Sequence, residues 1–194
     1  MTMQRENGII IGEVIDLEDP DGLGRVRVRF PYLGDQPSNW AKIASPMAGK
    51  NRGLFFRPEV GDEVLVAFEM GEPRRPYVLG GLWSSVDTPP PDDGNAKENN
   101  WRFFKSRSGH IWKFDDTKGS ERIEVIDKDG RHTIVIDSSG DKIQIICDSG
   151  NVEIKATAGK VQIDATNVEI TASASMKLES SGEMTIKGSV VNIN

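Results

Sequence analysis

The last third of the chain carries a repeat that restricts the possible folds more than any other feature. From residue 131 to residue 194, two apolar residues with one residue between them recur every seven to nine positions, separated by small polar residues. Strand side chains alternate between faces, so both members of a pair lie on one face, and the polar residues supply turns. The pattern predicts a β-solenoid of short strands and turns. The pairs are Ile134/Ile136, Ile143/Ile145, Val152/Ile154, Val161/Ile163, Val168/Ile170, Met176/Leu178, Met184/Ile186 and Val191/Ile193.

A strand with only two apolar side chains cannot bury them alone, and two arrangements would solve this. One chain could coil on itself at about 24 residues per three-strand rung, which leaves fewer than three rungs here. Alternatively, three chains could intertwine, so that every pair faces a shared axis and every strand is hydrogen-bonded to neighbouring chains. Burial of a Val or Ile side chain gains roughly 1.5–3 kcal/mol, whereas ordering the backbone costs about 1–2 kcal/mol per residue.

Hydrogen bonds to two other chains offset that cost, so we favour a homotrimer. The first seven pairs are then the predicted trimer core. Strands stacked at about 4.7 Å would extend roughly 110 Å.

Composition excludes several classes of protein. A formal net charge of −6 argues against a nucleic-acid surface. A single cysteine, Cys147, permits no intrachain disulfide, and we interpret it as a small core residue rather than a reactive or metal-binding thiol. The sequence has no apolar run of membrane-spanning length, and residues 1–7 lack the apolar region of a signal peptide. We therefore expect synthesis in a cytoplasm.

The part before the repeat reads as an all-β barrel followed by connecting strands. Short strands are predicted near residues 9–14, 25–30, 40–44, 54–56, 63–70 and 77–83, with Gly- and Pro-containing turns between them and no helical period. Residues 1–83 thus predict a small closed barrel. Residues 84–100 contain Pro-Pro-Pro-Asp-Asp-Gly and read as a linker, and residues 101–130 predict transition strands before the repeat of residues 131–194.

Three parts of the sequence, the barrel, the strands after the linker and the closing repeat, resemble a known family in that family's order. The segments DPDGLGRVRVRFPY and WAKIASPMAGKNRGLFFRPEVGDEVLVAFEMGEPRRPYVLGGLW are similar to the OB-fold barrel of phage spike proteins and of the type VI secretion spike VgrG. SRSGHIWKFDDTKGSERIEV resembles the family's neck, and the closing repeat resembles its triple-stranded β-helix. The resemblance covers residues 8–194.

The resemblance implies a homotrimeric central spike, a membrane-piercing needle of a contractile injection machine such as a phage tail, a tailocin or an extracellular injection particle. It would be made in the bacterial cytoplasm and assembled into a baseplate. VgrG carries a hub domain before the barrel, so a separate hub protein is expected at the OB end. Some phage spikes carry a lysozyme domain where only the linker stands here.

The resemblance also raises the question of a tip. Related short spikes close the needle with a His-x-His motif around iron, whereas this sequence has only His110 and His132, far from its last residue. We therefore expect no metal and no cofactor. The strand pattern still runs at Val191, Ile193 and Asn194, so we expect these residues to dock a separate PAAR-like tip protein.

Catalysis finds no support in the sequence. Asp115 and Asp116 stand in a turn-like Asp-Asp-Thr-Lys-Gly segment, and the sequence has no nucleophile elbow, phosphate loop or cluster of metal ligands. We predict that the chain is not an enzyme.

Two other functions stay open at this point. An OB protein for single-stranded nucleic acid could use Arg25, Arg27 and Arg29 as its phosphate track, although the same arginines also fit a solvated strand face. A trimeric tail-fibre or adhesin shaft could use the same repeat.

Overall fold

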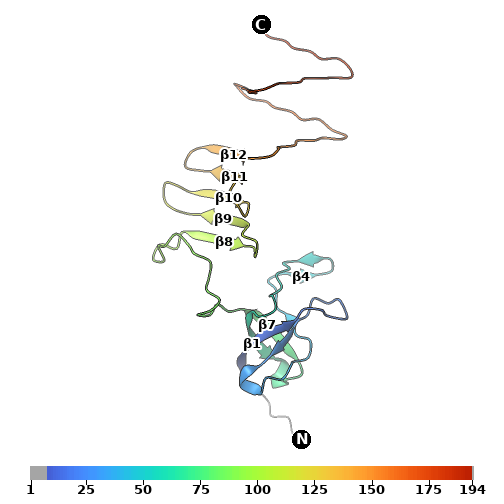
Figure 1. Cartoon of the computed structure of the whole chain (residues 1–194), viewed down its shortest axis with the longest axis vertical. Helices are drawn as coiled ribbons and strands as arrows, with labels where there is room; N and C mark the ends of the chain where they lie inside the picture. The colour runs from blue at the N-terminus through green and yellow to red at the C-terminus, as the bar shows by residue number, and fades with distance from the viewer. Residues whose placement is uncertain (1–7, 194) are drawn as a thin grey trace. The chain divides into compact units, whose positions relative to one another are not determined.

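The computed structural model describes residues 8–193 and shows an all-β chain, as predicted. The chain divides into two units, one ending at Ile146 and the other beginning at Cys147 (Figure 1). The described strands are β1 (Ile9–Asp16), β2 (Arg27–Arg29), β3 (Lys42–Ile43), β4 (Ala48–Gly49), β5 (Arg52–Gly53), β6 (Glu63–Phe68), β7 (Pro76–Gly81), β8 (Trp101–Lys105), β9 (Ile111–Asp115), β10 (Arg122–Ile126), β11 (His132–Asp137) and β12 (Lys142–Cys147). Two 3-10 helices complete the elements, η1 (Pro31–Leu33) and η2 (Glu69–Gly71).

The N-terminal strands form an OB-like barrel. Their sheet has the order β2-β1-β6-β7-β3, in which only β3 and β7 run parallel. An antiparallel bridge joins Val26 to Ala41, beside the two outermost strands, through backbone hydrogen bonds of 3.0 and 2.7 Å. This bridge links the two edges of the sheet and pairs part of the backbone that an open edge would leave unpaired.

The barrel has a small core of alternating residues. Val26, Val28 and Phe30 are buried along one strand, and Val64, Val66 and Phe68 along another. The rings of Phe30 and Phe68 meet edge to face at 5.5 Å between centroids. Strict alternation in the sequence therefore identified the inward-facing residues. The remaining core residues are Val14, Ala41 and Val78.

The structure differs from the sequence prediction around residues 48–56. A strand is predicted at residues 54–56, but the structure assigns none there. The hairpin instead lies just before them, where β4 pairs with β5 across Lys50 and Asn51. Asn51 has a φ of 55°, which suits the turn because asparagine tolerates the left-handed region. The chain reversal at residues 50–51 thus determined that β4 pairs with β5, although the aromatic residues that follow have the higher β propensity.

A second sheet follows the linker. Strands β8 to β12 lie in sequence order, and the described pairs from β8 to β11 are antiparallel. Three strands, β8, β9 and β10, thus lie within residues 101–130, where transition strands are predicted. The sheet continues without a break across residue 131 into the first two pairs of the repeat, which lie on β11 and β12.

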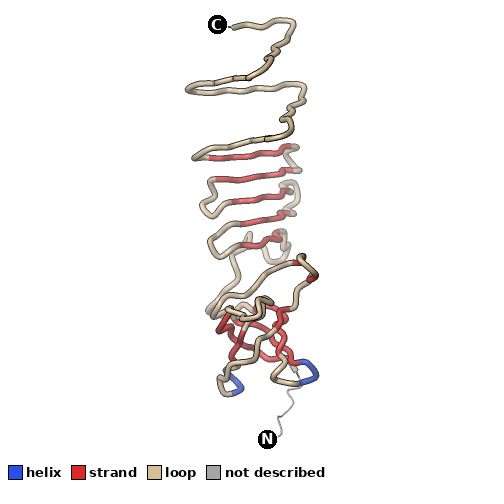
Figure 2. Tube along the Cα trace, turned by 90° about the vertical axis from the view of Figure 1, so that its right-hand side faces the viewer, coloured by secondary structure: helices blue, strands red, loops and turns tan. Residues whose placement is uncertain are grey.

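The C-terminal unit has a different character. No strand is assigned from residue 148 to residue 193, and every residue in that range is exposed. Figure 2 shows its trace as extended passes joined by turns. In the part of the chain that the structure describes, no helix has the length and apolar character needed to cross a membrane.

Candidate assembly surface

One face of the β8–β12 sheet is apolar and uncovered. Because successive residues point to opposite faces, Trp112 and Phe114 of β9 share a face with Phe104 of β8. Cross-strand pairing extends this face, since Trp112 lies opposite Val125 and Val125 lies opposite Ile134. We call these residues, together with Ile136, the aromatic face. Its members are 41–49% exposed.

The rings of the aromatic face are in contact with one another. Phe104 and Trp112 lie 6.4 Å apart between ring centroids, and Trp112 and Phe114 lie 5.6 Å apart. Contiguous apolar patches of this kind are rare on monomers and mark surfaces of association. The aromatic face therefore has the character of an interface.

The opposite face of the same sheet holds a nearly buried ion cluster. Lys113 Nζ lies 2.5 Å from Glu124 Oε2 and 3.9 Å from Asp115 Oδ2, and Arg122 lies 3.6 Å from each carboxylate. Lys113 Nζ also lies 4.0 Å from the centroid of the Trp101 ring, a cation–π contact. The charged groups of this face thus have partners of opposite charge within the chain, whereas the aromatic face is uncovered.

Asp115 is held in place by hydrogen bonds from a neighbouring residue. Its Oδ1 accepts hydrogen bonds from the Thr117 backbone N–H at 3.0 Å and from Thr117 Oγ1 at 2.5 Å. Burial raises the pKa of Asp115, but these hydrogen bonds and the charge of Lys113 outweigh it and hold the pKa below its ordinary value. Asp116 instead pairs with Arg102 at 2.9 Å. The two carboxylates have separate structural partners.

The side chains predicted to form the trimer core are not buried within this single chain. The first four lie on strands of the second sheet, Ile134 and Ile136 on β11 and Ile143 and Ile145 on β12, and they are 42–73% exposed. Among the predicted core pairs of the C-terminal unit, the first member is 47–58% exposed and the second member 65–75%. The first members are Val152, Val161, Val168, Met176 and Met184, and the second members are Ile154, Ile163, Ile170, Leu178 and Ile186.

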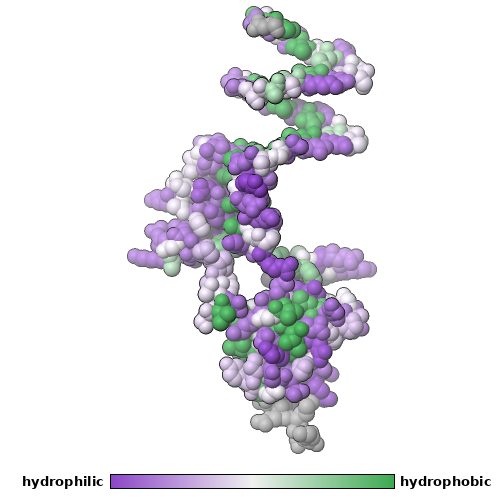
Figure 3. Space-filling view, viewed as in Figure 1, coloured by the Kyte–Doolittle hydropathy of each residue, from purple (hydrophilic) through white to green (hydrophobic). Residues whose placement is uncertain are grey.

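The physical reason for this exposure is the absence of covering strands. The prediction placed these side chains in the core of an assembly, and residues 148–193 form no strand pairs with the rest of the chain. One chain therefore supplies an apolar row but no second surface to pack on it. Burial of Ile170, Leu178, Ile186 and their neighbours in the repeat is not a property of the single chain. Figure 3 shows hydrophobic residues at the surface of this unit.

The predicted tip-docking residues are at the end of the same unit. Val191 and Ile193 are exposed, at 49% and 86%. Asn194 lies outside the described residues. The two described positions are thus accessible to a partner.

The predicted phosphate track is occupied by partners within the barrel. Arg25 binds Asp19 through two hydrogen bonds of 3.0 and 2.6 Å. Arg29 pairs with Glu13 at 2.7 Å. Arg27 donates to the Ser38 carbonyl and lies over the Trp40 ring, 5.8 Å from its centroid. These arginines thus tie strand β2 to the rest of the barrel.

Asp19 is the anchor of the turn before β2. In addition to the bonds from the Arg25 guanidinium, its carboxylate accepts hydrogen bonds from the backbone N–H groups of Asp21, Leu23 and Arg25. The hydrogen bonds from the Arg25 guanidinium, followed by these N–H groups, hold the pKa of Asp19 far below its ordinary value. The turn that the sequence indicated at Asp19-Pro20-Asp21-Gly22 is therefore organised by one carboxylate.

The two histidines and the cysteine each take part in local hydrogen bonds, and the backbone N–H of His132 donates to Asp127 Oδ1 at 3.1 Å. His110 Nδ1 accepts the Lys128 backbone N–H at 3.2 Å, which gives it a structural role in the sheet. Cys147 is partly buried, and its thiol donates to the Ser149 carbonyl at 3.3 Å. Within residues 8–193, no group of three or more His, Cys, Asp and Glu residues is placed to hold a metal ion.

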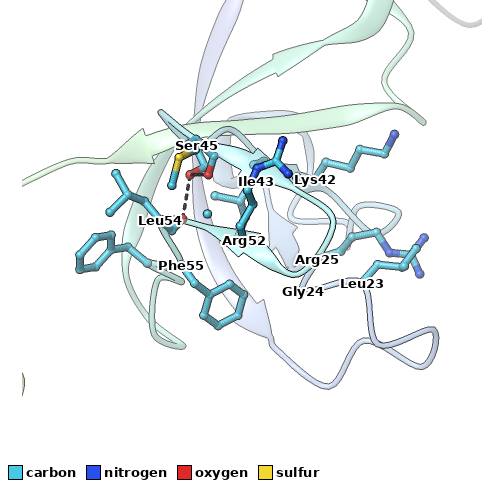
Figure 4. Close-up of a pocket in the computed structure, with 14 residues that line it drawn as sticks. Leu23, Gly24, Arg25, Lys42, Ile43, Ser45, Arg52, Leu54 and Phe55 are labelled. Atoms are coloured by element: carbon cyan, nitrogen blue, oxygen red, sulfur yellow. Dashed lines mark hydrogen bonds between the residues drawn. The ribbon is translucent and has the colours of Figure 1, made fainter.

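The barrel carries a pocket of about 680 Å³ beside the β4–β5 hairpin. Figure 4 shows Arg25, Lys42 and Arg52 on one side of it and Leu54 and Phe55 on the other. Ser45 Oγ donates a hydrogen bond to the Leu54 carbonyl at 2.7 Å, which fixes the start of the segment of residues 54–56. The segment's side chains nevertheless stay exposed, with Phe55 at 76%.

Sequence reasoning missed two of these surfaces as sites. The period-two spacing of Trp112 and Phe114 was a signal for the aromatic face, because it matches the spacing of the later pairs. The run Leu54-Phe55-Phe56 predicts a strand, but its consecutive apolar residues could also have indicated a surface patch.

This chain is similar to known proteins, and the matching family model lies on the barrel. Residues 10–83 match the family described as the type VI secretion system/phage-baseplate injector OB domain. The chain is 28% identical over 131 residues to the type VI secretion system spike protein VgrG1a of Pseudomonas aeruginosa, which covers 62% of this chain and 20% of the relative. It is 31% identical over 111 residues to the spike protein VgrG3 of Vibrio cholerae, covering 53% of this chain and 11% of that protein.

The matched region spans only a fifth or less of these relatives' length. The resemblance to VgrG-like spikes that the sequence indicated is confirmed.

Proposed function

We propose that this chain is the central spike of a contractile injection machine, because its residues 10–83 match the injector OB domain family and the chain resembles VgrG spike proteins. Three copies would wind their C-terminal units into a triple-stranded β-helix over residues 131–194. Sheath contraction would then drive this needle through the outer membrane of a target cell.

One observation carries the proposal above the others: the apolar pairs of the C-terminal unit have no cover in a single chain. Between residues 148 and 193 the structure assigns no strand, and side chains such as Ile154 and Ile163 are 75% and 69% exposed. Extended backbone without partners leaves its N–H and C=O groups to water and its apolar side chains unburied. Two further copies would supply both missing partners at once.

The sheet that precedes this unit supports the same arrangement. Its aromatic face is uncovered, whereas its other face already holds the Lys113–Glu124 pair. A trimer that closes the aromatic face around an axis would leave the charged face outward, where the ions remain near solvent. The interior would then run from aromatic side chains into the narrower aliphatic pairs.

The proposed action is mechanical, and we propose no enzymatic activity for the chain. A closed triple-stranded β-helix would resist bending because each strand is hydrogen-bonded on both sides and has no free edge. We propose a separate hub protein at the OB end and a PAAR-like tip protein on Val191 and Ile193. Synthesis in the bacterial cytoplasm, followed by assembly into a baseplate, completes the proposal.

The decisive experiment measures mass and length in solution. Light scattering should give about three times 21.4 kDa, and small-angle scattering should give a maximum dimension above roughly 110 Å. A folded monomer at micromolar concentration would overturn the proposal. A trimer that does not bind isolated baseplate hub protein would instead favour the fibre-shaft alternative.

A further inference from the structure

The segment Leu54-Phe55-Phe56 forms an exposed apolar patch on the barrel, which we call the barrel patch. Its three side chains are 46%, 76% and 65% exposed. The backbone at Leu54 is held at both its polar groups, since the Leu54 N–H donates to the Met47 carbonyl at 3.0 Å and Ser45 Oγ donates to the Leu54 carbonyl. A fixed backbone that presents large apolar side chains to water is typical of a contact surface.

The barrel patch is continuous with the aromatic face of the second sheet. The ring of Phe56 lies 5.9 Å from that of Phe104, edge to face, and Phe104 is the first ring of the aromatic face. Phe56, Phe104, Trp112 and Phe114 therefore form one line of rings in contact. An ion pair between Arg107 and Glu59, at 3.0 Å, joins the same two parts of the first unit.

This continuity identifies the occupant of the patch. On the proposed function, from which the inference follows, a second copy covers the aromatic face. A partner that covers Phe104 also reaches Phe56, because the two rings touch. The pocket beside the patch is lined largely by apolar side chains, among them Ile43 and Met47, so it suits an apolar side chain of that copy.

We propose that the barrel patch of each subunit packs against a neighbouring subunit, so that the contact between copies extends from the needle into the OB barrels. The barrels then associate through their own side chains, in addition to being tied together by the needle. Phe55 and Phe56 are the residues that make this contact, and the adjoining pocket receives part of the neighbour.

Photo-cross-linking of the full-length chain tests this inference. Phe56 is replaced by p-benzoyl-phenylalanine, which keeps an aromatic ring at the position, and Phe55 is replaced in the same way in a second variant. The matched control carries the same residue in place of Tyr32, which is aromatic and 80% exposed but lies on η1, away from the patch. Light scattering first establishes whether each variant is a trimer.

The expected result is a trimer in all variants, with at least fivefold more cross-linked dimer and trimer from positions 55 and 56 than from position 32. Mass spectrometry should place the acceptor on a neighbour's barrel or on its β8–β9 strands. Trimers that cross-link no more than the control, or only within one chain, overturn the inference and leave the proposed function intact. Variants and native chain that are all monomeric overturn both.

Discussion

The barrel and the C-terminal unit of this chain are built from similar apolar residues but bury them in different ways. In the barrel, Val14, Val64 and Val66 are fully buried by strands of the same chain. In the C-terminal unit, Val152 and Val161 are 58% and 57% exposed, although they have the same side chain and the same period-two setting. Burial is therefore decided by the presence of partner strands, not by the residue or its spacing.

The reason for the difference lies in chain connectivity. The barrel sheet joins residues far apart in sequence, such as those of β1 and β6, and its outermost strands are bridged through Val26 and Ala41. Extended segments of the C-terminal unit are followed by short polar turns and, over residues 148–193, pair with no strand of their own chain. The barrel core should thus form without assembly, whereas the core of the proposed needle should form only at protein concentrations that support the trimer.

The largest expected effect comes from Ile154→Asp. In a trimer it would place three carboxylates on the axis, where they must be desolvated without a partner. We expect loss of the trimer, measured by light scattering, while the barrel remains folded. Lys155→Asp is the matched control, since it adds the same side chain on the opposite face. A trimer that survives Ile154→Asp would show that this pair does not point inward.

A local defect in the barrel provides the contrast. Phe30→Ala removes a buried ring that contacts Phe68, and such a change costs about 3–5 kcal/mol of unfolding free energy. Denaturant unfolding of the barrel should show this loss at every protein concentration. Tyr32→Ala, two residues away and exposed, should change the free energy by no more than about 0.5 kcal/mol. A strong concentration dependence of the Phe30→Ala effect would contradict the comparison.

The ion cluster tests the sheet between the two regions. Lys113→Met leaves Asp115 and Glu124 close together with only Arg122 to balance them, and a broken, nearly buried pair costs about 3 kcal/mol. We expect the sheet to have a lower melting temperature, which circular dichroism measures. Lys105→Met replaces an exposed lysine of β8 and should have little effect. Equal effects of the two substitutions would mean that the cluster contributes nothing.

The smallest effect concerns the turn around Asp19. Its folded-state pKa lies well below the ordinary 3.8, so its stabilisation is present above about pH 4 and is lost as the pH falls further. Asp19→Asn should destabilise the barrel near pH 7, and the gap from the native chain should close towards low pH. Asp21→Asn, at a more exposed partner of Arg25, is the control and should change stability less. A gap that persists at low pH would show that charge is not the cause.

Much of the fold could be predicted from local patterns. Alternation around Val26 and Val28 and around Val64 and Val66 identified both strands and their buried faces. The strands of residues 101–126 were also expected close to where they lie. These features depend on side-chain period and turn residues, which are properties of short stretches of chain.

Other features depend on contacts that no short stretch contains. The β4–β5 hairpin replaced an expected strand at residues 54–56. The ion cluster requires Lys113 and Glu124 to lie opposite each other on neighbouring strands. The contact of Phe56 with Phe104 joins two segments separated by the linker.

By itself the sequence determined the all-β character of the chain, the strand faces and the repeat of apolar pairs, because the alternation of side chains is inherent in extended backbone. Only the tertiary structure decided which strands are neighbours, which face of the second sheet is satisfied by ions, and which face is left uncovered. Those outcomes depend on which segments, separated in the sequence, come into contact. A hydrogen bond or a buried side chain needs groups from two segments, so neither segment determines it alone.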